Sequence, residues 1–176
     1  MMSLAGCLVT HPTETAEWTV EYPLHKAAAG EKGEVRVSQV VVRSPYDSLG
    51  FVVLRSGGSM AVDPFNRFAS VPSQLLKGPV EDAFASCGKF STAVGSSSAA
   101  SVASVAEVSV SRIALDCRTE GSRKAVVSLV VRLLDRSRRI VSESRGEGVA
   151  DAAGGNYTDA FSQAFMAAID AALKDI

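Results

Sequence analysis

Apolar residues recur along the chain with two periods, one typical of strands and the other of helices. Apolar residues at every second position, or in short β-branched runs, predict eight strands at residues 18–22, 35–42, 51–55, 60–62, 90–94, 107–117, 125–133 and 139–149. Apolar residues three and four positions apart predict two amphipathic helices, at residues 70–87 and 157–176. The order of these elements predicts an α/β fold: a single domain with one mixed β-sheet and two main helices.

Turn-forming and capping residues mark where several of these elements begin and end. Gly57–Gly58 predicts a tight hairpin turn, because paired glycines adopt positive φ without strain. Ser70 is a suitable N-cap for the first helix, and Pro72 fits its first turn. Because a proline removes one hydrogen bond from a helix, we expect a kink at Gly78–Pro79.

The longest strands and the last helix carry the strongest patterns. Residues 125–133 have one fully apolar face and one partly apolar face, which predicts the central strand. Within 107–117 the apolar phase switches between Val110 and Ile113, which predicts either a β-bulge or burial on both faces. Asn156 or Thr158 is expected to cap the last helix. The apolar residues of that helix follow at four-residue steps with a last step of three: Tyr157, Phe161, Phe165, Ile169, Leu173 and Ile176.

Composition places the chain among ordinary globular domains. Of its 176 residues, 47% are hydrophobic and 21% are charged, and the net charge is −1. This balance gives no indication of a nucleic-acid partner or of binding to a bulk anionic surface. No apolar run reaches the length of about 18 residues that a membrane span needs. We therefore expect any attachment to a membrane to use an anchor.

The three cysteines predict one thiol with a special role. Cys7 ends the sequence Leu4-Ala5-Gly6-Cys7, which resembles the small-residue step before the lipidated cysteine of a bacterial lipoprotein. Because the basic and apolar parts of such a signal do not precede it, we interpret residues 1–7 as the remnant of a signal. Residues 8–17 are then a tether and residues 18–176 the domain. Cys87 and Cys117 form either a disulfide or two buried free thiols.

The sequence contains no recognisable catalytic or metal-binding pattern. Its two histidines are His11, in the predicted tether, and His25, in a predicted loop. The motifs of serine hydrolases, zinc proteases and dithiol enzymes are missing, and Glu81–Asp82 lies on the polar face of the first predicted helix. We therefore expect no enzymatic activity, no cofactor and no metal site. A hydrolase of an unrecognised kind would need His11 or His25 as its base.

One charge pattern stands out. Residues 112–145 contain nine Lys or Arg against four Asp or Glu, and the flanking segments are acidic. Arg136, Arg138 and Arg139 concentrate this excess at a predicted turn. One interpretation is a hairpin whose charges discourage edge-to-edge pairing. The other is a basic surface that contacts anionic headgroups or an acidic partner.

The element order and several short motifs resemble the ABC-type transport auxiliary lipoproteins, which accompany lipid-transport systems of the paraquat-inducible and Mla-like kind. The motifs are Leu4 to Cys7, Tyr22-x-Leu24, the hairpin at 51–62, and Asn66-Arg67-Phe68-Ala69 followed by Pro72 and an amphipathic helix. Family members usually carry Trp where Phe68 stands here. Because an aromatic residue before a helix also suits a core, we interpret Phe68 as a packing residue.

The resemblance implies a fold like the TolB amino-terminal domain, export, lipidation of Cys7 and residence in the periplasm. Leu8 after Cys7 implies sorting to the outer membrane. The implied function is that of a non-enzymatic accessory component of a transporter for lipids or apolar compounds. Its implied partners are an MCE-type membrane-anchored protein and an ABC permease and ATPase, and a homo-oligomer is among the implied assemblies. The alternative is a structural or assembly lipoprotein that binds outer-membrane or cell-wall proteins.

Overall fold

The structure of the protein, a computed structural model, describes residues 14–25 and 29–176. In this part of the chain one mixed sheet contains eight strands: β1 (Ala16–Trp18), β2 (Val35–Val42), β3 (Gly50–Arg55), β4 (Met60–Phe68), β5 (Ala93–Val94), β6 (Ser104–Cys117), β7 (Lys124–Leu134) and β8 (Ile140–Asp151). The helices are α1 (Pro72–Leu75), α2 (Lys77–Ser86) and α3 (Tyr157–Lys174), with a single 3-10 turn, η1, at Ser56–Gly58. The predicted α/β class, single domain and mixed sheet are confirmed.

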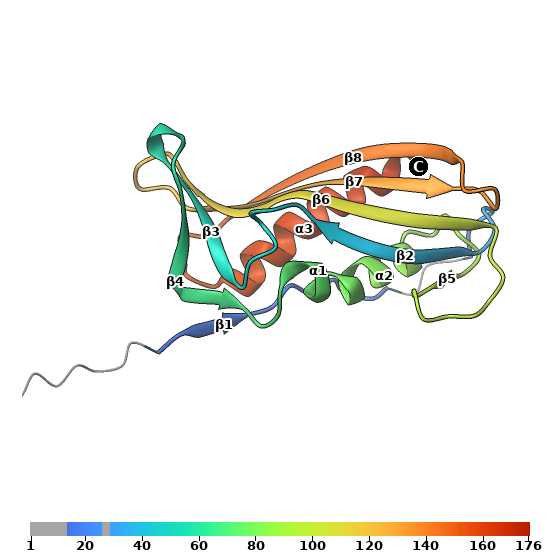
Figure 1. Ribbon diagram of the computed structural model, residues 1–176, viewed down its shortest axis with the longest axis horizontal. Helices are drawn as coiled ribbons and strands as arrows, with labels where there is room; N and C mark the ends of the chain where they lie inside the picture. Colours follow the sequence, from blue (N-terminus) through green and yellow to red (C-terminus); the bar gives the residue numbers. More distant parts are fainter. Residues whose placement is uncertain (1–13, 26–28) are drawn as a thin grey trace, which may run out of the picture.

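Strand β6 is the branch point of the sheet (Figure 1). One of its edges pairs antiparallel with β7, which pairs antiparallel with β8. Its other edge pairs parallel with β2 over its first half and parallel with β3 over Leu115–Cys117. β4 pairs antiparallel with β3 and parallel with β1, and β5 pairs with β2. The strand predicted to be central, β7, therefore has two neighbours, whereas β6 has three.

The phase switch in β6 is a bulge. The register between β6 and β7 shifts between Val110 and Arg112, so one residue is left without a partner in the ladder. Val110 and Ile113 consequently face the same core, and both are buried. The hairpin turn also follows the sequence, because Gly57 and Gly58 have φ values of 74° and 79°.

The helices contribute to one core with the sheet. α3 packs on β7 and β8, while α1 and α2 pack on β2. The residues at four-residue steps in α3 are all buried, and Asn156 caps the helix by accepting a hydrogen bond from the backbone N–H of Asp159 (3.3 Å). A second, smaller cluster consists of Val52, Leu54, Ala114 and Val126 with Tyr46 packed against it. No helix in the described ranges is both long enough and apolar enough to cross a membrane.

The first predicted helix is broken in two at a different place from the one expected. α1 ends at Leu75 and α2 begins at Lys77, so the break precedes Pro79. Pro79 lies in the first turn of α2, where a backbone N–H would have no intrahelical acceptor, and it therefore disturbs no hydrogen bond. The N-cap is Val71 rather than Ser70, and Asp47 accepts from the backbone N–H of Ser73 (2.8 Å).

The first strand lies earlier in the chain than residues 18–22. Ala16 and Glu17, assigned to the tether from sequence, pair with β4, and the chain then leaves the sheet to follow α3. The backbone N–H of Glu21 donates to the Ser162 hydroxyl (2.8 Å), and the Tyr22 hydroxyl donates to Asp170 (2.8 Å). Burial, with the neighbouring Asp170 carboxylate, raises the pKa of Tyr22. Side chains of α3 thus take the place of a strand partner here.

Two glycines let α3 lie directly on β8. A Cβ atom added to Gly146 would lie 1.8 Å from the carbonyl oxygen of Ala168, and one added to Gly148 would lie 1.9 Å from that of Ala164. Ala164, Ala168 and Ala172 form the facing stripe of α3 and are fully buried. The helix and the strand therefore meet backbone to backbone.

Gly146→Ala and Gly148→Ala are each expected to lower the free energy of unfolding by about 2 kcal/mol, because overpacking costs about 1–3 kcal/mol and the obstacle here is backbone. Urea unfolding measures the change. Gly154→Ala is the matched control, since a Cβ there meets nothing within 4 Å. Unfolding midpoints equal to that of the wild type would contradict this seating of α3.

An aromatic cluster joins α3 to the hairpin. The Phe68 ring lies 4.6 Å from the Phe51 ring and 5.1 Å from the Phe161 ring, measured between centroids. Tyr157 contacts Phe51 and Trp18 edge to face, at 5.3 and 5.1 Å. Phe68 is 1% exposed, which confirms its interpretation as a packing residue.

Phe68→Ala is expected to cost about 3–5 kcal/mol of stability, because it leaves a cavity among the surrounding rings. Phe68→Leu should cost less, since it retains more of the packing. Thermal unfolding of the two variants checks the order. Unchanged stability of Phe68→Ala, together with weaker binding of a partner, would instead make Phe68 an interface residue.

Candidate functional site

The structure places the residues singled out from the sequence in different surroundings. Cys7 and His11 lie outside the described residues. Cys87 and Cys117 are free thiols, each partly exposed, so no disulfide joins them. His25 is exposed, and its backbone N–H donates to the Ser86 hydroxyl (3.0 Å). Within residues 14–25 and 29–176, no group of three or more His, Cys, Asp or Glu is placed to hold a metal ion.

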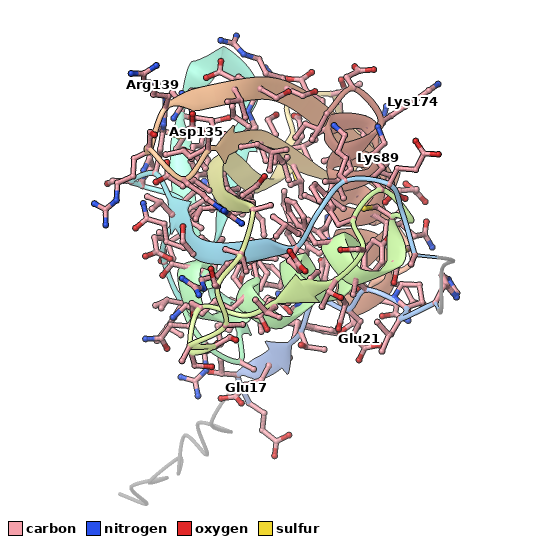
Figure 2. All side chains as sticks on the ribbon, turned by 90° about the vertical axis from the view of Figure 1, so that its right-hand side faces the viewer. Glu17, Glu21, Lys89, Asp135, Arg139 and Lys174 are labelled. Carbon is pink, nitrogen blue, oxygen red and sulfur yellow. The ribbon has the colours of Figure 1, made fainter. Side chains whose placement is uncertain are left out.

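Arg136, Arg138 and Arg139 lie together in the turn between β7 and β8, called the basic turn below. The Asp135 carboxylate orders it by accepting hydrogen bonds from the backbone N–H groups of Ser137 (2.8 Å) and Arg139 (2.9 Å). All three arginines are exposed, and Arg139 points outward from the molecule in Figure 2.

Part of the remaining basic run is neutralised locally. Arg132 pairs with Glu143 (2.6 Å) and Arg118 with Asp116 (2.5 Å). The hydrogen bond from each arginine lowers the pKa of its carboxylate partner. In the described part of the chain, no ion pair involves an arginine of the basic turn. The three arginines of the basic turn therefore present unpaired positive charge together at one end of the molecule.

An open cleft of about 760 Å³ lies at the opposite end of the sheet, between the β3–β4 hairpin, the β6–β7 turn and the start of α3. Its floor is apolar: Val53 of β3 pairs with Leu115 of β6, and both line the cleft. Two residues further along the strands, Arg55 pairs with Cys117. On the other edge of β6, Asp116 pairs with Lys124, the residue after Arg123. Arg123 therefore lies next to Cys117 on the side opposite Arg55.

The wall of the cleft is ordered by side-chain hydrogen bonds. The Asp63 carboxylate accepts from the backbone N–H groups of Phe65 (2.8 Å) and Asn66 (3.1 Å), which bends β4 there. The Asn66 side-chain oxygen accepts from the Trp18 indole (3.1 Å). On the opposite side, the Arg123 guanidinium donates to the Tyr157 hydroxyl (3.1 Å). The Phe65 side chain is half exposed at the mouth of the cleft.

Two arginines give the cleft its chemistry. Neither Arg55 nor Arg123 forms an ion pair with any carboxylate of the described residues. Of the two acidic residues on the lining, Asp63 is occupied by the hydrogen bonds of the wall, and Glu120 is exposed in the β6–β7 turn. The cleft can therefore bind a group that is apolar at one end and anionic at the other.

The sequence does not reveal this cleft. Arg123 was visible in the basic run, but Arg55 had no distinguishing feature. The two line the same cleft because β3 pairs with the end of β6, and the register of a parallel pair distant in sequence leaves no local signal.

No protein-family model and no curated protein matches the sequence. Solved structures do match the fold. Protein XCC0632 from Xanthomonas campestris, of the family DUF330, superposes with a TM-score of 0.67 over 84% of this chain and 87% of its own, at 18% identity. A second structure, of an uncharacterized protein, superposes with a TM-score of 0.63 over 85% of this chain and 91% of its own, also at 18% identity. The chain shares the fold of these two structures. The PelC dodecamer from Paraburkholderia phytofirmans superposes with a TM-score of only 0.44, at 13% identity over 89% of this chain and 93% of its own.

Proposed function

We propose that this protein is a non-enzymatic accessory component of an ABC-type transporter that handles lipids or apolar compounds in a cell envelope. The proposal includes lipidation of Cys7, residence in the periplasm at the outer membrane, and action beside an MCE-type protein with its ABC permease and ATPase. The Leu4 to Cys7 lipobox and the family resemblance support it. So does the cleft, whose apolar floor can contact an acyl chain.

The position of the cleft relative to the predicted anchor carries the proposal. Ala16, the first residue of β1, pairs with Asn66 of the cleft wall. Ala16 is nine residues after Cys7, and an extended chain spans at most about 3.4 Å per residue, or ~30 Å here. A lipid on Cys7 therefore keeps the cleft close to the membrane surface. The tether also gives the cleft a high effective concentration toward membrane-bound partners.

The basic turn lies at the other end of the molecule. β6 extends over 14 residues between the two ends, which corresponds to about 45 Å. In Figures 1 and 2, β1 with Glu17 and the turn with Arg139 lie at opposite ends and on opposite edges. With the anchor near the cleft, the basic turn faces away from the anchoring membrane. We therefore assign it to contact with an acidic surface of a partner.

Co-purification tests the proposal. The chain is expressed behind a complete lipoprotein signal, envelopes are extracted in mild detergent, and the proteins recovered with it are identified by mass spectrometry. We expect an MCE-type protein or its permease with the wild type and neither with Cys7→Ser, because the anchor brings the partners together.

The alternative function predicts a different set of partners. A structural or assembly lipoprotein would recover only outer-membrane or cell-wall proteins, with no transporter subunit. That result would overturn the proposed function in favour of a scaffold.

A triple variant tests the basic turn. Replacing Arg136, Arg138 and Arg139 with Ser is expected to leave the melting temperature unchanged, because all three side chains are exposed. Recovery of the transporter subunit should fall, most clearly at low salt, where exposed charges act over the longest range.

The matched control removes three positive charges elsewhere. Arg43, Lys77 and Lys124 are exposed and form no ion pair within the described chain. Their replacement with Ser should leave recovery intact. Equal recovery with both triple variants would assign the basic turn to protection of the hairpin edge.

A further inference from the structure

We propose that the cleft binds a single-chain anionic amphiphile, with Arg55 and Arg123 holding a carboxylate or phosphate head and the apolar floor contacting the alkyl chain. The choice of an amphiphile rests on the proposed transport function. The anionic head is argued independently from Arg55 and Arg123, two cations of the lining that form no ion pair within the described residues.

The size and walls of the cleft suit a small ligand. Its volume of about 760 Å³ falls among pockets that take molecules of drug size, about 300–1,000 Å³. Val53 and Leu115 lie side by side in the floor, where Leu115 is almost fully buried, and the half-exposed Phe65 also lines the cleft. An alkyl chain laid along this floor would remove apolar surface of both partners from water.

The two arginines lie at one end of the floor, on either side of Cys117. Arg55 is on β3 and Arg123 begins the approach to β7, with β6 and Cys117 between them. Strands two apart lie about 10 Å from each other, so two long arginine side chains can converge on one anion above Cys117. A guanidinium binds a carboxylate or phosphate through two parallel hydrogen bonds. The hydrogen bond from Arg123 to Tyr157 fixes that guanidinium and leaves other N–H groups for a ligand.

Cys117 provides a native reporter of occupancy. It lines the cleft and is partly exposed. The chain has only two other cysteines, so Cys7→Ser with Cys87→Ser leaves Cys117 as the single thiol of the full chain. A ligand on the floor should shield this thiol from iodoacetamide.

The test measures alkylation of Cys117 and calorimetric binding with dodecyl phosphate, dodecanoate and dodecyl maltoside, all as monomers. We expect protection by one or both anionic probes and little by the uncharged maltoside. A stronger effect of one anion identifies phosphate or carboxylate as the preferred head. Equal protection by dodecyl maltoside, or none by either anion, would overturn the proposal.

Variants locate the head group. Arg55→Ala with Arg123→Ala should weaken binding of the preferred anion by about tenfold or more, since each guanidinium supplies charge-assisted hydrogen bonds to the head group. Replacing Arg136, Arg138 and Arg139 with Ser should leave the affinity unchanged, which distinguishes a specific site from general attraction to positive charge. Equal losses in both variants would count against the cleft.

Circular dichroism melting confirms that each variant is folded before binding is compared. Because the isolated chain is used, failure here leaves the co-purification test of the transporter role untouched. Conversely, binding of the anion in the absence of any transporter partner would support the cleft even if the proposed function failed.

Discussion

The backbone contact between α3 and β8 is the constraint on which the rest of the structure depends. Gly146 and Gly148 allow the helix to approach until its alanine stripe meets the strand, and a side chain at either glycine would collide with helix carbonyl oxygens. Once α3 is seated, its aromatic residues reach the hairpin, where Phe161 meets Phe51 and Phe68. One contact at the edge of the sheet thereby sets the position of a cluster on the other side of the core.

The same contact determines where the sheet is left uncovered. α3 begins at Tyr157, and beyond that residue the floor formed by β3 and β6 has no helix over it (Figure 1). The bent end of β4 and the β6–β7 turn then form walls around this floor, and the cleft results. Tyr157 connects the two features, because its ring packs on Phe51 while its hydroxyl holds Arg123. Tyr157 therefore belongs both to the aromatic core and to the wall of the cleft.

Local signals predicted local structure well. Strand β2 has the bounds expected from its β-branched run, and Asn156, one of the two residues expected to cap α3, is its N-cap. Features that depend on distant pairing were missed. The branching of β6 and the placement of Arg55 in the cleft that Arg123 also lines follow from parallel registers that no short pattern encodes. Gly146 and Gly148 lay in a strand expected to be merely polar, and only the seated helix explains them.

The central claim is that the cleft, rather than the basic turn, is where an anionic amphiphile binds. Chemical-shift mapping tests this most directly: the isotopically labelled chain, with Cys7→Ser, is titrated with dodecyl phosphate below its micelle concentration, and amide signals are followed residue by residue. The account predicts saturable shifts at Arg55, Cys117, Arg123 and Tyr157. Shifts centred on 136–139, or spread over the sheet without saturation, would contradict it.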